Sequence, residues 1–167
     1  MKRIFRLLFI LHAFVGLGAI GGGIMAILNP QGPGGMPTDA LKNSPFSNFL
    51  IPGIILFIVI GLGNVFSAVT LLLKSRFQGY ISSVFSLALV IWIIIQCIML
   101  NAVAYLHIIF FIIGLVEAAL SIIILFKQHL YPTNIILNII ANLQKKFPTN
   151  IILINIMKLK RKFNALD

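Results

Sequence analysis

The chain has 167 residues, of which 60% are hydrophobic and 10% are charged. Soluble domains average about 45–50% apolar and about 25% charged residues, so this composition excludes a soluble globular domain, a disordered chain and a collagen-like protein. In a soluble protein the formal charge of +10 would indicate a nucleic-acid partner, but the positions of the cations in this chain favour a different explanation of the charge, given below.

A basic segment, Met1-Lys2-Arg3, precedes the first long apolar run, which covers residues 4–28. A signal peptide is one interpretation of this segment, but its apolar core would be only about 7–15 residues long. We therefore predict that residues 4–28 form a membrane span that stays in the protein. Three further apolar runs follow, over residues 49–73, 80–100 and 104–126.

Each run is long enough to cross a hydrocarbon core of about 30 Å. Each must be helical, because an isolated segment in lipid can satisfy its backbone groups only internally. The connections at 74–79 and 101–103 are short and force antiparallel neighbours, whereas the connection at 29–48 is longer and rich in Pro and Gly. The predicted fold class is all-α, an antiparallel four-helix transmembrane bundle over residues 1–126.

The basic residues predict the orientation of this bundle. Twelve of the thirteen Lys and Arg residues fall before or at the very start of the first run, between the second and third, or after the fourth, which all lie on one side. Only Lys42 lies on the other side. The positive-inside rule then places both termini in the cytoplasm and the protein in the cell (inner) membrane. The charge is accounted for by topology and anionic lipid, without nucleic acid.

Residues 127–167 form a tail of different composition. The sequence Pro-Thr-Asn-Ile-Ile-Leu begins at residue 132 and again at residue 148. Apolar residues at helical spacing follow each copy, so we predict two basic amphipathic helices on the cytoplasmic leaflet, with a solvated tail as the alternative. The cations expected to contact anionic headgroups are Lys145, Lys146, Lys158, Lys160, Arg161 and Lys162.

Glycines recur inside the first span. Residues 16–21 match the dinucleotide-binding pattern G-x-G-x-x-G. That pattern works only between a strand and a helix N-terminus, where free amides meet a pyrophosphate, so we reject it here. Gly18 and Gly22 instead form G-x-x-x-G, which lets another backbone approach. The residues predicted to pack helices closely are Gly16, Gly18, Gly22, Gly61, Gly114 and Ala118.

Little of the chain could carry out catalysis. There is one cysteine, Cys97, which excludes an intramolecular disulfide, and there are three acidic residues in total. We predict no catalytic residue, no metal site and no cofactor. His107 is expected as an interfacial anchor near the outer end of the fourth span, Trp92 as packing, and Gln96 as a polar bridge on the outer side.

Three polar residues on three different spans share one depth. His12, Asn64 and Glu117 each lie eight or nine residues from the cytoplasmic end of their span, which is roughly 12–14 Å. Ser86 is slightly shallower in the third span. Each lies on a helix face with small residues, which predicts that it points inward. An ionised carboxylate facing lipid is very unfavourable, so we hypothesise a buried hydrogen-bonded cluster, either fixing helix register or forming a proton- or substrate-responsive site.

Several loop and packing motifs carry a family resemblance. They are Asn29-Pro30-Gln31-Gly32, Gly35-Met36-Pro37, Ser44-Pro45-Phe46-Ser47-Asn48-Phe49-Leu50-Ile51-Pro52-Gly53 and Gly61-Leu62-Gly63-Asn64. With these motifs, residues 1–126 resemble small uncharacterised four-span integral membrane proteins of bacteria and, more distantly, DoxX-like proteins. The resemblance implies a four-helix membrane fold. Asn64 stands where DoxX-like proteins often have a carboxylate, so the resemblance implies no redox-partner role.

The leading functional hypothesis is a small non-enzymatic multi-pass membrane protein, an accessory or assembling subunit that pairs with a second copy or with another membrane protein. One alternative is a proton-coupled or small-solute transporter that uses the Glu117 layer. A second alternative is a membrane enzyme acting on lipid or quinone. A water-reachable cavity ending at Glu117 would favour transport. A dry and filled bundle would favour a structural role, and a lipid-sized opening near His107 would favour an enzyme.

Overall fold

The computed structural model describes residues 2–127 and contains four helical segments that are long and apolar enough to cross a membrane. They are Lys2–Leu28, Leu50–Leu72, Gln78–Leu100 and Tyr105–Phe126. The chain divides into two compact units, Met1–Ile124 and Leu125–Asp167, and the description below concerns the first. The fold is a helical bundle of a multi-pass membrane protein, as the sequence predicts, with span ends that differ from the predicted ones by one or two residues. The predicted helices of the tail lie outside the described residues.

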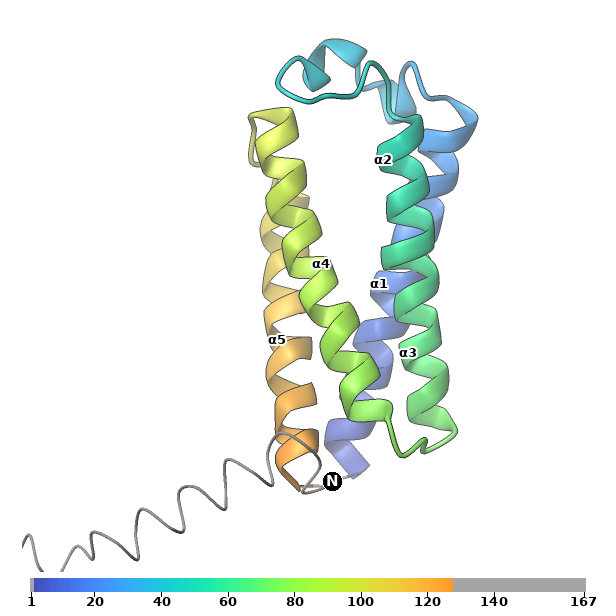
Figure 1. The fold of residues 1–167 in the computed structure, drawn as a ribbon, viewed down its shortest axis with the longest axis vertical. Helices are drawn as coiled ribbons and strands as arrows, with labels where there is room; N and C mark the ends of the chain where they lie inside the picture. Colours follow the sequence, from blue (N-terminus) through green and yellow to red (C-terminus); the bar gives the residue numbers. More distant parts are fainter. Residues whose placement is uncertain (1, 128–167) are drawn as a thin grey trace, which may run out of the picture. The chain divides into compact units, whose positions relative to one another are not determined.

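The first span is one helix, α1 (Lys2–Leu28), and the second is made of α2 (Leu50–Ile55), the π-helical segment η3 (Leu56–Leu62) and α3 (Gly63–Leu72). The third and fourth are α4 (Gln78–Leu100) and α5 (Tyr105–Lys127). Two 3-10 turns, η1 (Pro33–Gly35) and η2 (Thr38–Leu41), lie in the long connection. The chain start and the α3–α4 turn lie at one end of the bundle, and the other two connections lie at the opposite end (Figure 1).

Local sequence explains where the helices end. Asn101 follows α4 in the left-handed conformation, with φ 46°, and closes the helix with a backbone bond to Ile98. Asn is one of the few residues that adopt this conformation readily at a helix C-terminus. In the long connection Gly34 has φ 61°, where a side chain would be strained.

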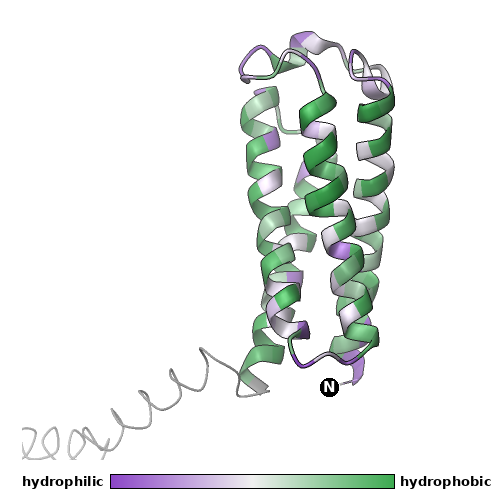
Figure 2. Cartoon of the chain, turned by 45° about the vertical axis from the view of Figure 1, so that its right-hand side comes forward, coloured by the Kyte–Doolittle hydropathy of each residue, from purple (hydrophilic) through white to green (hydrophobic). Residues whose placement is uncertain are grey.

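The outward faces of the spans are apolar (Figure 2). Large side chains such as Leu17, Phe66 and Ile91 are 53–68% exposed. Exposed apolar surface of this extent is unfavourable in water and normal in lipid. The inward faces divide along the bundle axis into an apolar cluster around Val15, Ile60 and Leu89, a polar layer, and a second apolar cluster formed by Leu8, Leu71 and Ile124.

Candidate functional site

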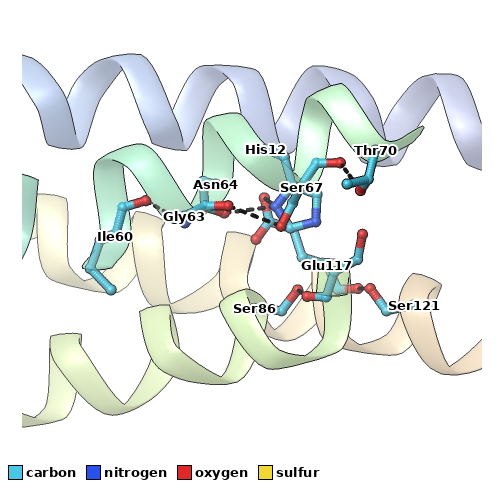
Figure 3. A network of polar contacts seen from close by, with 10 residues as sticks. His12, Ile60, Gly63, Asn64, Ser67, Thr70, Ser86, Glu117 and Ser121 are labelled. Atoms are coloured by element: carbon cyan, nitrogen blue, oxygen red, sulfur yellow. Dashed lines mark hydrogen bonds and ion pairs between the residues drawn. The ribbon is translucent and has the colours of Figure 1, made fainter. Parts of the chain in front are cut away.

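The structure brings His12, Asn64 and Glu117 together inside the bundle (Figure 3). His12 Nδ1 lies 2.7 Å from Asn64 Oδ1 and 3.4 Å from Glu117 Oε1. All three side chains are fully buried, and they come from α1, α3 and α5. The shared depth in the sequence therefore corresponds to direct contact, and we call these three residues the polar cluster.

The amide of Asn64 fixes the proton on the imidazole. Asn64 Nδ2 donates a hydrogen bond to the backbone oxygen of Ile60, one turn earlier in η3, at 2.7 Å. The amide oxygen therefore faces His12 and acts as the acceptor, so His12 Nδ1 must be the donor. His12 Nε2 is buried and has no hydrogen-bond partner among the described residues. The orientation of His12 thus depends on the π-helical segment through Asn64.

Glu117 has one ionisable side chain, His12, within reach among the described residues. Both of its carboxyl oxygens are buried and make no hydrogen bond within the described part of the chain, and Oε1 is at ion-pair distance from His12 Nδ1. An uncompensated carboxylate at this depth is costly. The pair avoids a net charge in two arrangements, with the proton on the carboxyl group and a neutral imidazole, or with a carboxylate beside an imidazolium. The cluster can therefore hold a proton without exposing charge to lipid.

Buried hydroxyl groups surround the polar cluster but bond to their own helices. Ser86 Oγ donates to the backbone oxygen of Ser82 at 2.6 Å, and Ser121 Oγ donates to that of Glu117 at 2.7 Å. Ser67 Oγ likewise donates to Gly63 at 3.1 Å. Ser86 therefore lies in the polar layer, fully buried, without a hydrogen bond to the cluster. The carbonyl one turn back is the nearest acceptor for a helical serine.

Close packing of α1 against the second span depends on glycines. A Cβ atom added at Gly16 would lie 2.9 Å from the Val65 side chain, and one at Gly61 would lie 2.8 Å from that of Ile20. Gly23, which the spacing places on the same face as His12 and Gly16 although it was not among the residues predicted to pack closely, is tighter still, at 2.7 Å from Phe57 Cβ. Gly114 of α5 makes a similar approach to Val90 of α4, at 2.9 Å. These positions bring the helices close enough for the polar cluster to form.

The predicted G-x-x-x-G pair does not make this approach. Gly18 is exposed, and an added Cβ would lie 3.7 Å from Phe110, while one at Gly22 would lie 3.4 Å from Leu56. Both are ordinary van der Waals distances. The prediction for this pair is corrected because the contact face of α1 follows Gly16 and Gly23. Ala118 of α5 is half-buried.

A second feature lies in the other half of the bundle, away from the chain start. All four spans and the long connection line a partly open cavity of about 600 Å³. It runs from Ala102 and Gly34, in the connections, to Val15, Ile60 and Leu89. In this half the α4–α5 pair diverges from α1 and α2 (Figure 1).

Gly18 and Gly22 line this cavity, which explains why they contact no neighbouring backbone. Because the cavity is partly open, molecules from its surroundings can enter it.

The cavity does not reach the polar cluster. Val15, Ile60 and Leu89 are each 1% exposed and form its inner end. His12, Asn64 and Glu117 lie beyond them and line neither this cavity nor the shallower pocket of about 540 Å³ between α4 and α5. Apolar side chains therefore separate the polar cluster from the cavity.

His107 and Gln96 are the strongly polar side chains of the cavity wall. His107 lies in the first turn of α5, and its Nδ1 accepts a hydrogen bond from the Ala104 backbone N–H at 3.0 Å. In neutral His107 the proton is therefore on Nε2, which is left as a donor. Gln96 is half-buried on α4 and makes no hydrogen bond within the described part of the chain. Both residues lie on the side predicted from the sequence to be the outer one; an opening was anticipated near His107, but Gln96 was not connected to it.

No group of three or more His, Cys, Asp or Glu residues that could hold a metal ion occurs among residues 2–127. Comparison with protein-family models, with curated proteins and with solved structures finds no match to this chain. The fold and composition define a helical multi-pass membrane protein. Its specific role therefore has to be argued from the polar cluster and the cavity.

Proposed function

We propose that the protein is a small non-enzymatic membrane component, an accessory or assembling subunit, in which the polar cluster holds the helices in register. The observation that carries the proposal is that the polar cluster is buried and links three helices. His12, Asn64 and Glu117 are fully buried, come from three helices that His12 joins by contacting both of the others, and lie between two apolar clusters. Interhelical polar contacts of this kind commonly fix helix association in membranes.

Transport through Glu117 would need a path for water or solute to its carboxyl group. The apolar side chains at the inner end of the cavity oppose such a path. An enzymatic role has one supporting observation, the position of His107 on the cavity wall. The described lining, however, offers no Ser, Cys, Asp, Glu, Lys or Arg to complete a nucleophilic or acid–base arrangement. The cavity is therefore better suited to binding than to a reaction.

We place both termini in the cytoplasm and the protein in the cell membrane of a bacterium. Lys2, Arg3, Arg6, Lys74 and Arg76 gather at one end of the bundle, whereas Lys42 at the other end is paired with Asp39 at 3.1 Å. The asymmetry supports this orientation by the positive-inside rule. The tail cations, Lys145 to Lys162, would then face anionic headgroups; they lie outside the described residues.

The decisive experiment compares the full chain with Glu117→Gln in liposomes, using an internal pH-sensitive dye under an imposed pH gradient. Glutamine preserves the shape of the side chain while removing its titratable proton. Neither protein should carry protons faster than protein-free liposomes. A flux in the unmodified protein that Glu117→Gln abolishes would overturn the proposal in favour of transport.

The accessory role is tested separately by native mass spectrometry after gentle extraction from the membrane of origin. We expect a second copy, or another membrane protein, in fixed stoichiometry. A single copy that carries no protein partner in repeated preparations would contradict an assembling role.

A further inference from the structure

The cavity in the half of the bundle away from the chain start has the character of a ligand site. We propose that it binds a neutral amphipathic lipid, with an acyl chain inside the cavity and an uncharged head whose acceptor oxygen bonds to His107 and Gln96. This inference is independent of the proposed accessory role, because it rests on the cavity and not on the polar cluster.

The size and position of the cavity favour an occupant taken from the bilayer. Its volume of about 600 Å³ falls within the 300–1,000 Å³ typical of small-molecule sites. It lies between the membrane-spanning helices and extends to the connections at one end, and most of its wall is apolar, including Trp92 and Phe110. An acyl chain therefore meets the same kind of surface inside the cavity as in the hydrocarbon core.

The charge of the lining favours a neutral head. None of the residues described as lining the cavity is Lys, Arg, Asp or Glu, and His107 is the only ionisable side chain among them. A carboxylate or phosphate head brought to this wall would lose hydration without gaining a fixed counter-charge. An ester or hydroxyl head avoids that cost.

The hydrogen-bonding groups favour an acceptor on the head. Ala104 N–H occupies His107 Nδ1, so the neutral imidazole presents Nε2–H as a donor. The Gln96 amide has no partner in the described part of the chain and can add a second donor. An ester carbonyl oxygen can accept a hydrogen bond from either of these two groups.

Trp92 supplies a built-in probe for this proposal, because it is the single tryptophan of the chain and lines the cavity. Bromine quenches tryptophan fluorescence only at short range. The full-length protein in nanodiscs is titrated with a monoacylglycerol brominated on its acyl chain, with the corresponding brominated fatty acid at a pH where it is ionised, and with a bromoalkane. We expect saturable quenching by the monoacylglycerol, with an affinity at least about threefold higher than for the other two.

Two glycines on α1 provide a matched pair of variants. Gly18 lines the cavity, whereas a Cβ added at Gly21 would meet nothing within 4 Å and Gly21 is not part of the lining. Gly18→Leu should fill the cavity and abolish saturable quenching, while Gly21→Leu should leave it unchanged. If Gly18→Leu fails to fold, Gly22→Leu occupies the same cavity from the next turn.

The polar contacts are tested by removing one donor at a time. Gln96→Leu and His107→Phe should each weaken monoacylglycerol binding by about 3–10-fold and leave bromoalkane binding unchanged. The proposal is overturned by non-saturable quenching that is equal for all three compounds, which indicates bulk lipid only. It is also overturned by preference for the ionised fatty acid, or by unchanged affinity in a folded Gly18→Leu or Gly22→Leu protein.

Discussion

Replacing Gly23 with alanine should separate two helices that are now in backbone contact. A Cβ atom at this position would lie 2.7 Å from Phe57 Cβ, 2.8 Å from Phe57 N and 2.9 Å from Phe57 Cα. Carbon atoms in favourable contact lie about 3.5–4.0 Å apart, so α1 and η3 would have to move apart by roughly 0.8 Å. Because two of the three opposing atoms are backbone, a change of side-chain rotamer cannot relieve the overlap.

The expected cost follows from two opposing effects. Overpacking of a well-packed interior costs about 1–3 kcal/mol, whereas alanine gains up to about 1 kcal/mol over glycine in helix propensity. We expect Gly23→Ala to lower the free energy of unfolding by up to about 2 kcal/mol. Gly21→Ala is the matched control on the same helix, since nothing lies within 4 Å of its Cβ position. That variant should be about 0.5–1 kcal/mol more stable than the unmodified protein.

The assay is equilibrium unfolding in mixed micelles, with helix content followed by circular dichroism as the fraction of denaturing detergent increases. The sign of the effect should differ between the two substitutions. If Gly23→Ala proved as stable as Gly21→Ala, the close approach of α1 to η3 and the role assigned to this glycine would both be refuted.

The remaining predictions concern hydrogen bonding, helix termination and orientation. Asn64→Ala removes the 2.7 Å contact with His12 and should cost about 1–2 kcal/mol in the same assay; no loss of stability would contradict the assigned role of the polar cluster. Asn101→Ala places a Cβ atom at φ 46° without the polar side chain of Asn, and should lower the free energy of unfolding by about 1 kcal/mol, whereas Asn101→Gly should not lower it. Equal stabilities of the two variants would contradict the left-handed conformation at this helix end. Single cysteines at Ser47 and Ser75, in a chain without its native cysteine, should react with a membrane-impermeant maleimide from outside and from inside the cell respectively, and the reverse pattern would invert the proposed orientation.

Part of the candidate site could be predicted from the sequence. Few strongly polar residues interrupt the spans, and the constant rise of a helix converts their positions into depths. His12, Asn64 and Glu117 share a depth and lie on faces with small residues, so their convergence followed from local pattern alone. Ser86 shows the limit of this argument, because equal depth does not determine which acceptor a hydroxyl group uses, and the carbonyl of Ser82 is nearer.

The sequence by itself determined the four spans and their predicted orientation, because hydrophobic length and the positions of Lys and Arg are local properties that the bilayer imposes on any helix. The tertiary structure decided that, among the glycines of α1, Gly16 and Gly23 and not Gly18 and Gly22 make the close backbone approach to the second span, since helix rotation depends on the shape of the neighbouring surface. It also decided that the spans diverge around a cavity. Residues from all four spans form the cavity together, so it cannot be predicted from the sequence pattern of any one segment. The interior of the bundle thus contains one buried carboxyl group, Glu117, in one half, and a cavity lined by no Lys, Arg, Asp or Glu in the other.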